Sequence, residues 1–400
     1  MFENIIGQQA TVATLRKELA EARFPAAVLL HGPLYSGKLS TALEIARVLT
    51  CGQQGEWSCS CSSCRQQRLL VHPATLLAGS RYFEAEIAAA AESLRRVRKA
   101  AAQYLFIRAV RKLTRRFDPP LWEGEESRIR PLAGTLAQVE EALDALIPDG
   151  ELEEKTLERR LEAIIAGCRQ LARALPAENV PIHLIRRASA WLHLTATGES
   201  PRRVLILENA EGLLEASANS LLKLLEEPPT DTFLILTTVR RAALIPTVLS
   251  RLRPYAFADR SPAETAEVLT RIFREEAGEY PSLREYFLHW REVNPAELES
   301  LAQLFVGAIL PGREERGETG PLLLKLAEVF AGRPGRDSVA TFFEELTLRF
   351  GRLLRDGRVP PQRLERWNAV LRRHQEACAR YNQQPLLTME SLLFSLRRVP

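Results

Sequence analysis

The distribution of apolar residues along the chain predicts strands that alternate with helices. Three short apolar runs have the length and composition of buried strands, at Ala26–His31, Val204–Leu207 and Phe233–Thr238. A helical pattern follows the first run from Lys38 to about Leu49, and another at about Glu215–Glu226 separates the other two. This alternation predicts an α/β fold, with a parallel sheet covered by helices on both faces.

Two other parts of the chain contain no strand-like run and are predicted to be helical. The stretch at about 81–180 is rich in Ala, Leu, Arg and Glu, and interrupts the α/β pattern as a helical insertion. The pattern is helical again after about residue 258. Breaks in it predict two small helical domains, at 259–315 and 316–400, that follow a core at 1–258.

Composition and charge narrow the range of functions. Apolar residues make up 46% of the 400 residues, which is enough for the cores of two to four domains. The 54 basic and 50 acidic residues nearly balance, so any contact with nucleic acid would need a local basic patch. No apolar run approaches the roughly 18 residues of a membrane span, and no signal peptide is visible at the N-terminus. We therefore expect a cytoplasmic protein that does not bind membranes.

A phosphate-binding loop is predicted directly after the first strand. The segment Gly32–Lys38 reads G-x-x-x-x-G-K and opens a helix, which is the context that this motif requires. Gly32 and Gly37 let backbone N–H groups surround a phosphate, and Lys38 adds a positive charge at the helix N-terminus. The alternative is an ordinary strand–turn–helix with a chance lysine.

The residue after the lysine changes the chemistry expected of this loop. A loop that binds Mg²⁺ has Ser or Thr at this position, because the hydroxyl is a metal ligand, whereas this chain has Leu39. Ser40 follows, but one residue turns a helical side chain by about 100°, so its hydroxyl should point elsewhere. A phosphate could still bind here, while Mg²⁺ loses a ligand.

The second predicted strand ends in the acidic motif VLILENAE at 204–211, which has the form of a Walker B strand. In P-loop ATPases that carry the motif hhhhDEAD, where h is an apolar residue, the Asp helps to hold Mg²⁺ and the following Glu activates water. Glu208 and Asn209 occupy these two positions here. A neutral amide cannot accept a proton from water, so general-base chemistry is lost at Asn209.

The stretch from Ile206 to Arg251 resembles the clamp-loader branch of the AAA+ ATPases. The resemblance lies in ANSLLKLLEEPP at 218–229, in the strand end LTT at 236–238 and in LIPTVLSR at 244–251. It covers about residues 1–80 and 181–258, and it implies an AAA+ P-loop core in which Thr237 or Thr238 stands at the sensor 1 position. The alternative is that these threonines are ordinary β-branched strand residues. By position only, 259–315 corresponds to the helical lid of that family and 316–400 to its C-terminal collar, the oligomerisation domain.

Within that branch, the chain resembles the delta-prime subunits of bacterial DNA polymerase III. The resemblance implies a stator that does not hydrolyse ATP and that lends an arginine finger, here Arg251, to a neighbouring motor subunit. It also implies partners: the gamma/tau and delta subunits, and the sliding clamp and primer-template DNA through the assembled complex. Whether ATP or ADP binds is left open.

Three alternatives remain at this point. Arg251 could be an ordinary surface arginine at a helix end. The chain could be an active gamma/tau-type motor, in which Glu208 holds Mg²⁺ and another residue activates water. It could also be a zinc-bearing AAA+ protein outside replication.

Four of the six cysteines crowd into one short loop, with the spacing C-x7-C-x-C-x2-C at Cys51, Cys59, Cys61 and Cys64. Four thiolates in such a loop suit a tetrahedral, structural Zn²⁺. Clamp-loader subunits of this type carry a four-cysteine zinc module at this place, so the resemblance implies zinc as well, although one spacing is shorter here. The alternative is a set of free or redox-active thiols.

The predicted insertion is divided by charge. Ser93–Phe117 holds nine basic residues and no acidic one, whereas Glu140–Glu162 holds nine acidic and three basic residues. The basic run could contact DNA phosphates. It could instead pair with the acidic segment in a helical hairpin, which the complementary charges favour slightly, or dock another protein.

Overall fold

The computed structural model describes residues 1–81, 83–147, 154–176, 179–194, 201–276, 278, 280–290, 295–310, 319–330, 336–381 and 384–399. The chain divides into two compact units, unit 1 at Met1–Phe287 and unit 2 at Leu288–Pro400. Each unit is described by itself. Among the described residues, no helix is long and apolar enough to cross a membrane.

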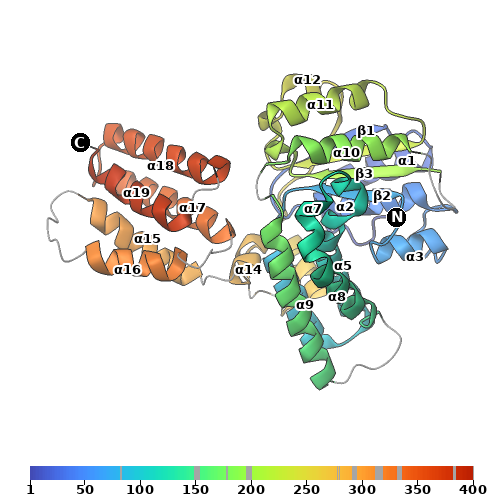
Figure 1. The fold of residues 1–400 in the computed structure, drawn as a ribbon, viewed down its shortest axis with the longest axis horizontal. Coiled ribbons are helices and arrows are strands. Elements are labelled where there is room, and N and C mark those ends of the chain that lie inside the picture. Colours follow the sequence, from blue (N-terminus) through green and yellow to red (C-terminus); the bar gives the residue numbers. More distant parts are fainter. Residues whose placement is uncertain are drawn as a thin grey trace. The chain divides into compact units, whose positions relative to one another are not determined.

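Unit 1 is built around a five-stranded sheet in which every pairing is parallel (Figure 1). The strands lie in the order β2-β3-β4-β1-β5. Their bounds are β1 Ala27–His31, β2 Thr75–Gly79, β3 Arg203–Glu208, β4 Thr232–Thr238 and β5 Arg253–Ala256. The predicted parallel α/β sheet is therefore confirmed.

Helices cover both faces of the sheet because alternate residues of each buried strand point to opposite sides. On one face, Leu29 and Leu207 join a core formed with α10 and α11. On the other face, Leu30 and Ile206 join a core formed with α1 and α2, which includes Leu39. The helices on these two faces are α1 Gln9–Ala20, α2 Lys38–Thr50, α10 Ile182–His193, α11 Glu215–Glu226 and α12 Pro246–Leu249.

Two of the five strands were not predicted from the sequence. β2 has only five residues, and its end is fixed by Gly79, where a Cβ atom would lie 2.0 Å from the backbone oxygen of Glu208. β5 has four residues, of which only Tyr255 is buried. Such short elements carry too little periodic pattern to be recognised without their neighbours.

The described part of 81–180, which we call the helical segment, consists of helices, as predicted. Its core is formed by apolar faces of α4, α5, α8 and α9, with Phe106, Leu143 and Leu161 fully buried. The bounds are α4 Glu84–Val97, α5 Ala100–Thr114, a 3-10 turn at Arg115–Phe117, α6 Pro119–Trp122, α7 Glu126–Ile129, a 3-10 turn at Arg130–Leu132, α8 Ala133–Asp144 and α9 Glu154–Ala174.

The remaining helices of unit 1 follow the sheet. Short elements come after the cysteine loop and after β3, β4 and β5: α3 Ser62–Arg68, 3-10 turns at Ala210–Gly212 and Arg241–Ala243, α13 Pro262–Val268, a π-helical turn at Leu269–Phe273 and α14 Leu283–His289. A capping box at Ser261 and Glu264 fixes the start of α13.

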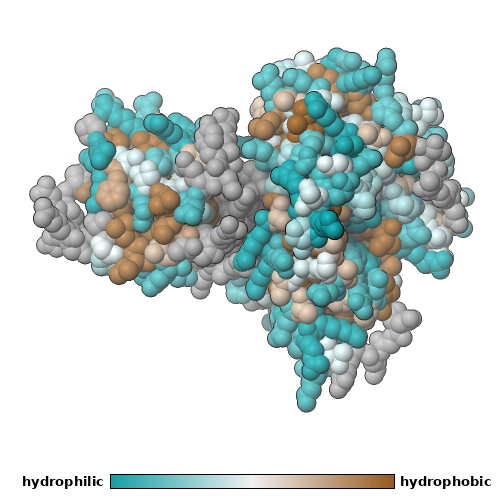
Figure 2. All heavy atoms as spheres, viewed as in Figure 1, coloured by the Kyte–Doolittle hydropathy of each residue, from teal (hydrophilic) through white to brown (hydrophobic). Residues whose placement is uncertain are grey.

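Unit 2 is a set of helices around a core that contains Phe305, Phe342 and Trp367. The helices are α15 Pro295–Ile309, α16 Thr319–Phe330, α17 Arg336–Arg355, α18 Pro361–Tyr381 and α19 Pro385–Arg397. Figure 2 shows apolar side chains on the drawn face over α15 and α16. Leu304 of α15 is 43% exposed and Leu324 of α16 is 68% exposed.

The division into core, lid and collar stays a prediction. The predicted boundary between lid and collar, at 315–316, lies outside the described residues. Along the chain, the boundary between the two compact units falls between Phe287 and Leu288, inside the predicted lid. α13 belongs to unit 1, and α15 belongs to unit 2.

Candidate nucleotide site and metal centre

The predicted phosphate loop joins the carboxyl end of β1 to the start of α2. Gly32 has φ of +149°, and a Cβ atom there would lie 2.3 Å from the backbone oxygen of Phe257. Gly37 has φ of +96° and lies against the guanidinium of Arg260. Both positions therefore require glycine for close approach or a left-handed backbone.

The lysine of this loop is turned back onto the loop itself. The Lys38 ammonium donates hydrogen bonds to the backbone oxygens of Gly32 at 2.8 Å and Pro33 at 2.5 Å, and to the hydroxyl of Ser36 at 3.2 Å. Burial lowers the pKa of Lys38 to about 8, partly offset by the carboxylates of Glu211 and Glu208. All three ammonium hydrogens are thus used within the chain.

Arg260 and Phe287 also close over the loop, and sequence reasoning did not find them. Arg260 donates to the backbone oxygen of Tyr35 and, at 3.3 Å, to that of Ile6. The Tyr35 ring stacks on Phe287, with centroids 4.8 Å apart. Arg260 carries no recognisable motif in the sequence, because its role depends on a contact across 225 residues.

The positions that would serve Mg²⁺ are changed in structure as well as in sequence. Leu39 is buried in the core on the α2 face of the sheet, so it offers no oxygen to the site. Ser40 is half-buried, and the next hydroxyl, of Thr41, donates to the backbone oxygen of Gly37 at 2.9 Å. Neither the Leu39 side chain nor the Thr41 hydroxyl therefore replaces the missing ligand.

Glu208 and Asn209 lie at the carboxyl end of β3 and are both engaged. One carboxylate oxygen of Glu208 accepts from Arg81, and the other accepts from Arg116 at 2.6 Å. The amide nitrogen of Asn209 donates to the backbone oxygen of Ser80 at 2.8 Å. Mg²⁺ needs near-octahedral oxygen ligands, and a carboxylate held by two guanidinium groups does not fit that requirement. The residues present here therefore do not fit a Mg²⁺ site.

The predicted sensor residue, Thr238, closes the same edge of the sheet. Its hydroxyl donates to the Glu211 carboxylate at 2.7 Å, and the neighbouring Thr237 hydroxyl lies 3.4 Å from the backbone nitrogen of Asn209. The strand order places β3, β4 and β1 side by side. The structure thus brings the phosphate loop, Glu208 and Thr238 together at the carboxyl ends of these strands.

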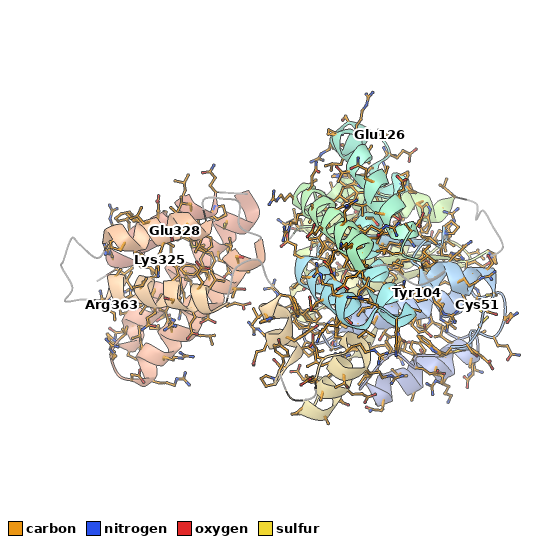
Figure 3. All side chains as sticks on the ribbon, turned by 90° about the horizontal axis from the view of Figure 1, so that it is seen from below. Cys51, Tyr104, Glu126, Lys325, Glu328 and Arg363 are labelled. Atoms are coloured by element: carbon orange, nitrogen blue, oxygen red, sulfur yellow. The ribbon has the colours of Figure 1, made fainter. Side chains whose placement is uncertain are left out.

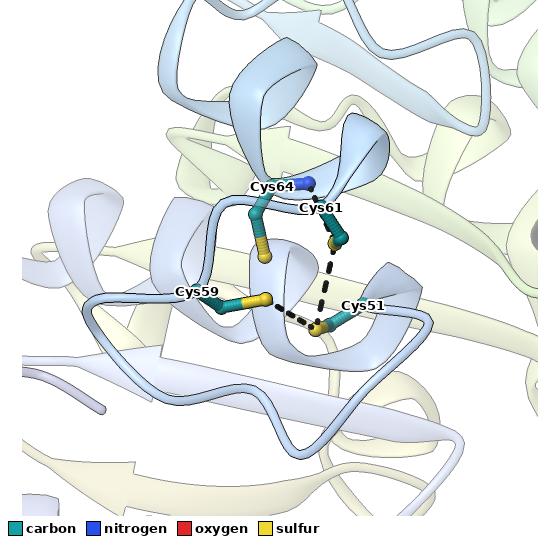
Figure 4. Close-up of side chains that lie close together, drawn as sticks. All are labelled: Cys51, Cys59, Cys61 and Cys64. Atoms are coloured by element: carbon teal, nitrogen blue, oxygen red, sulfur yellow. Dashed lines mark hydrogen bonds between the residues drawn. The ribbon is translucent and has the colours of Figure 1, made fainter.

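The four cysteines form a separate cluster at the end of α2 (Figure 4). All four sulfur atoms lie within 4.8 Å of one another. The Cys51 sulfur is 3.6 Å from that of Cys59 and 3.9 Å from that of Cys61. A tetrahedral zinc site with Zn–S bonds of about 2.3 Å has sulfur atoms about 3.8 Å apart, so these spacings fit the ion. The shortened spacing between Cys59 and Cys61 is compatible with this geometry.

Two neighbouring groups favour the thiolate form at Cys64 and Cys61, although burial raises the pKa of Cys64. The buried Arg47 donates to the Cys64 sulfur at 3.1 Å and is fixed by Glu44 at 2.7 Å. Although burial alone would raise it, N–H groups of the backbone at Cys64 and Gly52 lower the pKa of Cys61 to about 6. Cys51 and Glu126 lie far apart in Figure 3, so the cluster is distant from the start of α7.

The predicted arginine finger lies at the amino ends of the strands, whereas the phosphate loop lies at their carboxyl ends. Arg251 comes just before β5, whose residue Arg253 pairs with Val28 near the amino end of β1. The side chain is 33% exposed and contacts Glu226 at 2.5 Å and the backbone oxygen of Thr247 at 2.8 Å. It therefore does not take part in its own chain's phosphate loop.

Many of the basic side chains of the helical segment are satisfied within unit 1. Arg95 pairs with Glu158 of α9, and the buried Arg111 pairs with Glu140 and Asp144 of α8. This is the pairing of basic and acidic segments that the charge pattern favoured. Other partners lie elsewhere: Arg96 binds Glu275, Lys112 binds Glu86, Arg116 binds Glu208, and Arg108 donates to the backbone oxygens of Gln67 and Arg68.

Comparison with known proteins agrees with the class that this geometry defines, a P-loop core of the AAA+ α/β type. A family model described as DNA polymerase III, delta subunit, matches residues 7–117 and 163–261, more than half of the chain. The chain belongs to this family and is a delta-prime-like member of the clamp-loader subunits. Residues 118–162, within the helical segment, lie outside the match.

Individual relatives match over shorter stretches. The delta-prime subunit of DNA polymerase III from Bacillus subtilis (strain 168) is 28% identical over 198 residues, which are 45% of this chain and 56% of the relative. That of Pseudomonas aeruginosa is 40% identical over 78 residues, 20% of this chain and 24% of the relative. The gamma/tau subunit of Mycobacterium tuberculosis (strain H37Rv) is 35% identical over 78 residues, 20% of this chain and 14% of the relative. The chain thus spans about half the length of the first of these relatives, and less of the others.

Proposed function

We propose that this chain is a non-hydrolysing clamp-loader subunit that lends Arg251 to the ATP site of a neighbouring motor subunit. The observation that carries the proposal is the separation of two features on one sheet. The phosphate loop follows the carboxyl end of β1, whereas Arg251 precedes β5 at the amino end. An exposed arginine at the amino end of the strands can stabilise transition-state charge only on another molecule's nucleotide.

The chain's own site is proposed to be silent. Lys38 is bonded to its own loop, Leu39 is apolar and Glu208 is held by two arginines. Asn209 cannot act as a general base because its amide has no proton-accepting basicity near neutral pH. ATP or ADP binding would require Lys38 and Arg260 to exchange their backbone partners for phosphate.

The proposed setting is the DNA polymerase III clamp loader, with gamma/tau and delta subunits as neighbours. Contact with the sliding clamp and primer-template DNA would come through the assembled complex. A structural Zn²⁺ is proposed at Cys51, Cys59, Cys61 and Cys64, where all four positions around the ion would be filled by protein. Unit 2 is proposed to assemble with partner subunits, which its exposed leucines support.

The test is a complex reconstituted from this chain and its motor subunit. Arg251→Ala should lower ATP turnover at the site that it serves by roughly 10³-fold or more, since an arginine finger contributes roughly 10³–10⁵ in rate. Assembly of the complex should be unchanged by gel filtration. Arg128→Ala is the matched control, because Arg128 is also exposed and paired with a glutamate. Full turnover with Arg251→Ala in an intact complex would exclude the proposed role.

A second candidate, an active gamma/tau-type motor, is favoured only by the preserved loop glycines and Lys38. It predicts ATP turnover by the isolated chain with Mg²⁺, abolished by Lys38→Ala. We expect no such turnover.

A further inference from the structure

The buried charges around Glu208 form a network that reaches from the sheet into the helical segment. Arg81 and Arg116 hold the two oxygens of Glu208. Arg81 also contacts Glu86 at 2.5 Å, and the second oxygen of Glu86 accepts from Lys112. Three cations and two carboxylates thus share one buried site, and four of the five belong to the helical segment.

The network is built to keep its charges in place. Lys112, Arg116 and Glu208 are all buried, and the Arg116 guanidinium lies over the Phe83 ring, 5.8 Å from its centroid. Burial alone would raise the pKa of Glu86, but the cations Lys112 and Arg81 outweigh it and lower that pKa to about 2. A buried charge that is paired and hydrogen-bonded in this way is costly to separate.

Arg81 and Arg116 supply the positive charge that a metal ion would otherwise supply to the Glu208 carboxylate. In a P-loop site, the acidic residue at the end of the Walker B strand requires a cation, normally Mg²⁺. Here that strand is β3, and the residue is Glu208. Here two guanidinium groups already bind both oxygens of that carboxylate, and their positive charges repel a further cation. Leu39 removes the other protein ligand on the phosphate-loop side.

We propose that Arg81 and Arg116 are built-in counter-cations for Glu208, through which the helical segment blocks assembly of a metal–nucleotide site. This gives the helical segment an internal role: it fixes the end of β3 by an intramolecular contact that excludes divalent metal. The inference concerns only the chain's own site and does not depend on Arg251 acting on a neighbour.

The test measures metal uptake rather than turnover. Mn²⁺ is used as the probe, because electron paramagnetic resonance reports free Mn²⁺ directly. The wild-type chain and Glu208→Gln should remove the same amount of Mn²⁺ from solution, with and without ADP. Greater uptake by the wild-type chain than by Glu208→Gln would overturn the proposal, since Glu208 would then be a metal ligand already. This comparison requires no change to the arginines.

A second comparison tests the arginines themselves. Arg81→Met combined with Arg116→Met leaves the Glu208 carboxylate without its partners and should tighten Mn²⁺ binding at least tenfold. The gain should vanish when Glu208→Gln is added. Arg111→Met is the control, because Arg111 is as buried as Arg116 but pairs with Glu140 and Asp144.

A folded double variant that gains no Mn²⁺ affinity would show that the arginines do not exclude the metal, and would overturn the proposal. Circular dichroism establishes folding first. If the double variant does not fold, Arg81→Met and Arg116→Met are measured singly, and folded single variants without any gain in Mn²⁺ affinity would overturn the proposal. Full ATP turnover by a complex that carries Arg251→Ala would contradict the proposed function. It would leave the Mn²⁺ result unchanged.

Discussion

The cysteine cluster allows the most direct test of a structural metal. Replacing Cys64 by Ser removes a buried sulfur that accepts from Arg47, and leaves three of the four ligands. The cluster closes a loop from Cys51 to Cys64, and a covalent cross-link of a 15-residue loop contributes about 3 kcal/mol. If zinc constrains the loop in the same way, Cys64→Ser should cost about 3 kcal/mol. For unit 1, Met1–Phe287, an unfolding entropy of about 2.1 cal/mol/K per residue makes that a fall in Tm of roughly 5 °C.

The assay combines metal content with thermal unfolding. Inductively coupled plasma mass spectrometry should find one zinc per wild-type chain and little in Cys64→Ser, and calorimetry should record the lower Tm. Cys378→Ser is the control, because Cys378 lies on α18 in unit 2, outside the cluster. A wild-type chain purified without zinc, with four thiols that react at once, would refute the metal assignment. Full zinc and unchanged Tm in Cys64→Ser would refute it equally.

Two further predictions concern Leu39 of the phosphate loop and Asp118, which pairs with Arg115 at 3.0 Å. Leu39→Thr restores the hydroxyl of the phosphate loop but should cost about 2–4 kcal/mol in unfolding free energy, because a packed side chain is lost. It should restore no ATP turnover in a phosphate-release assay. Any turnover would contradict the account of Glu208 and Asn209. Burial raises the pKa of Asp118 to about 7, so its contribution to stability is present at low pH and is lost as pH rises through 7. Asp118→Asn should flatten the fall in urea-unfolding free energy between pH 4 and 7, by up to about 1.4 kcal/mol per pH unit. An unchanged slope would contradict the raised pKa of Asp118.

Local patterns carried much of the fold because they are expressed within single elements. The run VLIL predicted β3 because a strand buried on both faces is apolar throughout, and α11 was predicted with its observed bounds because two prolines follow it. β5 escaped prediction because three of its four residues are exposed. Its place in the sheet is decided by pairing with β1, which is far away in sequence.

The candidate site divides in the same way. The phosphate loop, Glu208 and the cysteines are motifs of adjacent residues, so the sequence reveals them. The contacts of Arg81, Arg116 and Arg260 span 127, 92 and 225 residues, and nothing local marks these arginines among the others. The sequence did show an excess of basic residues in the helical segment, but their partners depend on how α4 and α5 pack against the end of β3.

These internal contacts bear on the proposed role of this chain as a stator. A ligand shifts a conformational equilibrium only by the difference in its binding free energy to the two states. In this chain Lys38, Glu208 and Asn209 already bond to protein groups, so a nucleotide would have to replace those contacts rather than add to them. The net free energy available to drive a change of conformation is therefore small. Unit 1 should therefore keep one conformation with and without nucleotide. Under the proposed function, this would hold Arg251 at a constant position for the motor subunit.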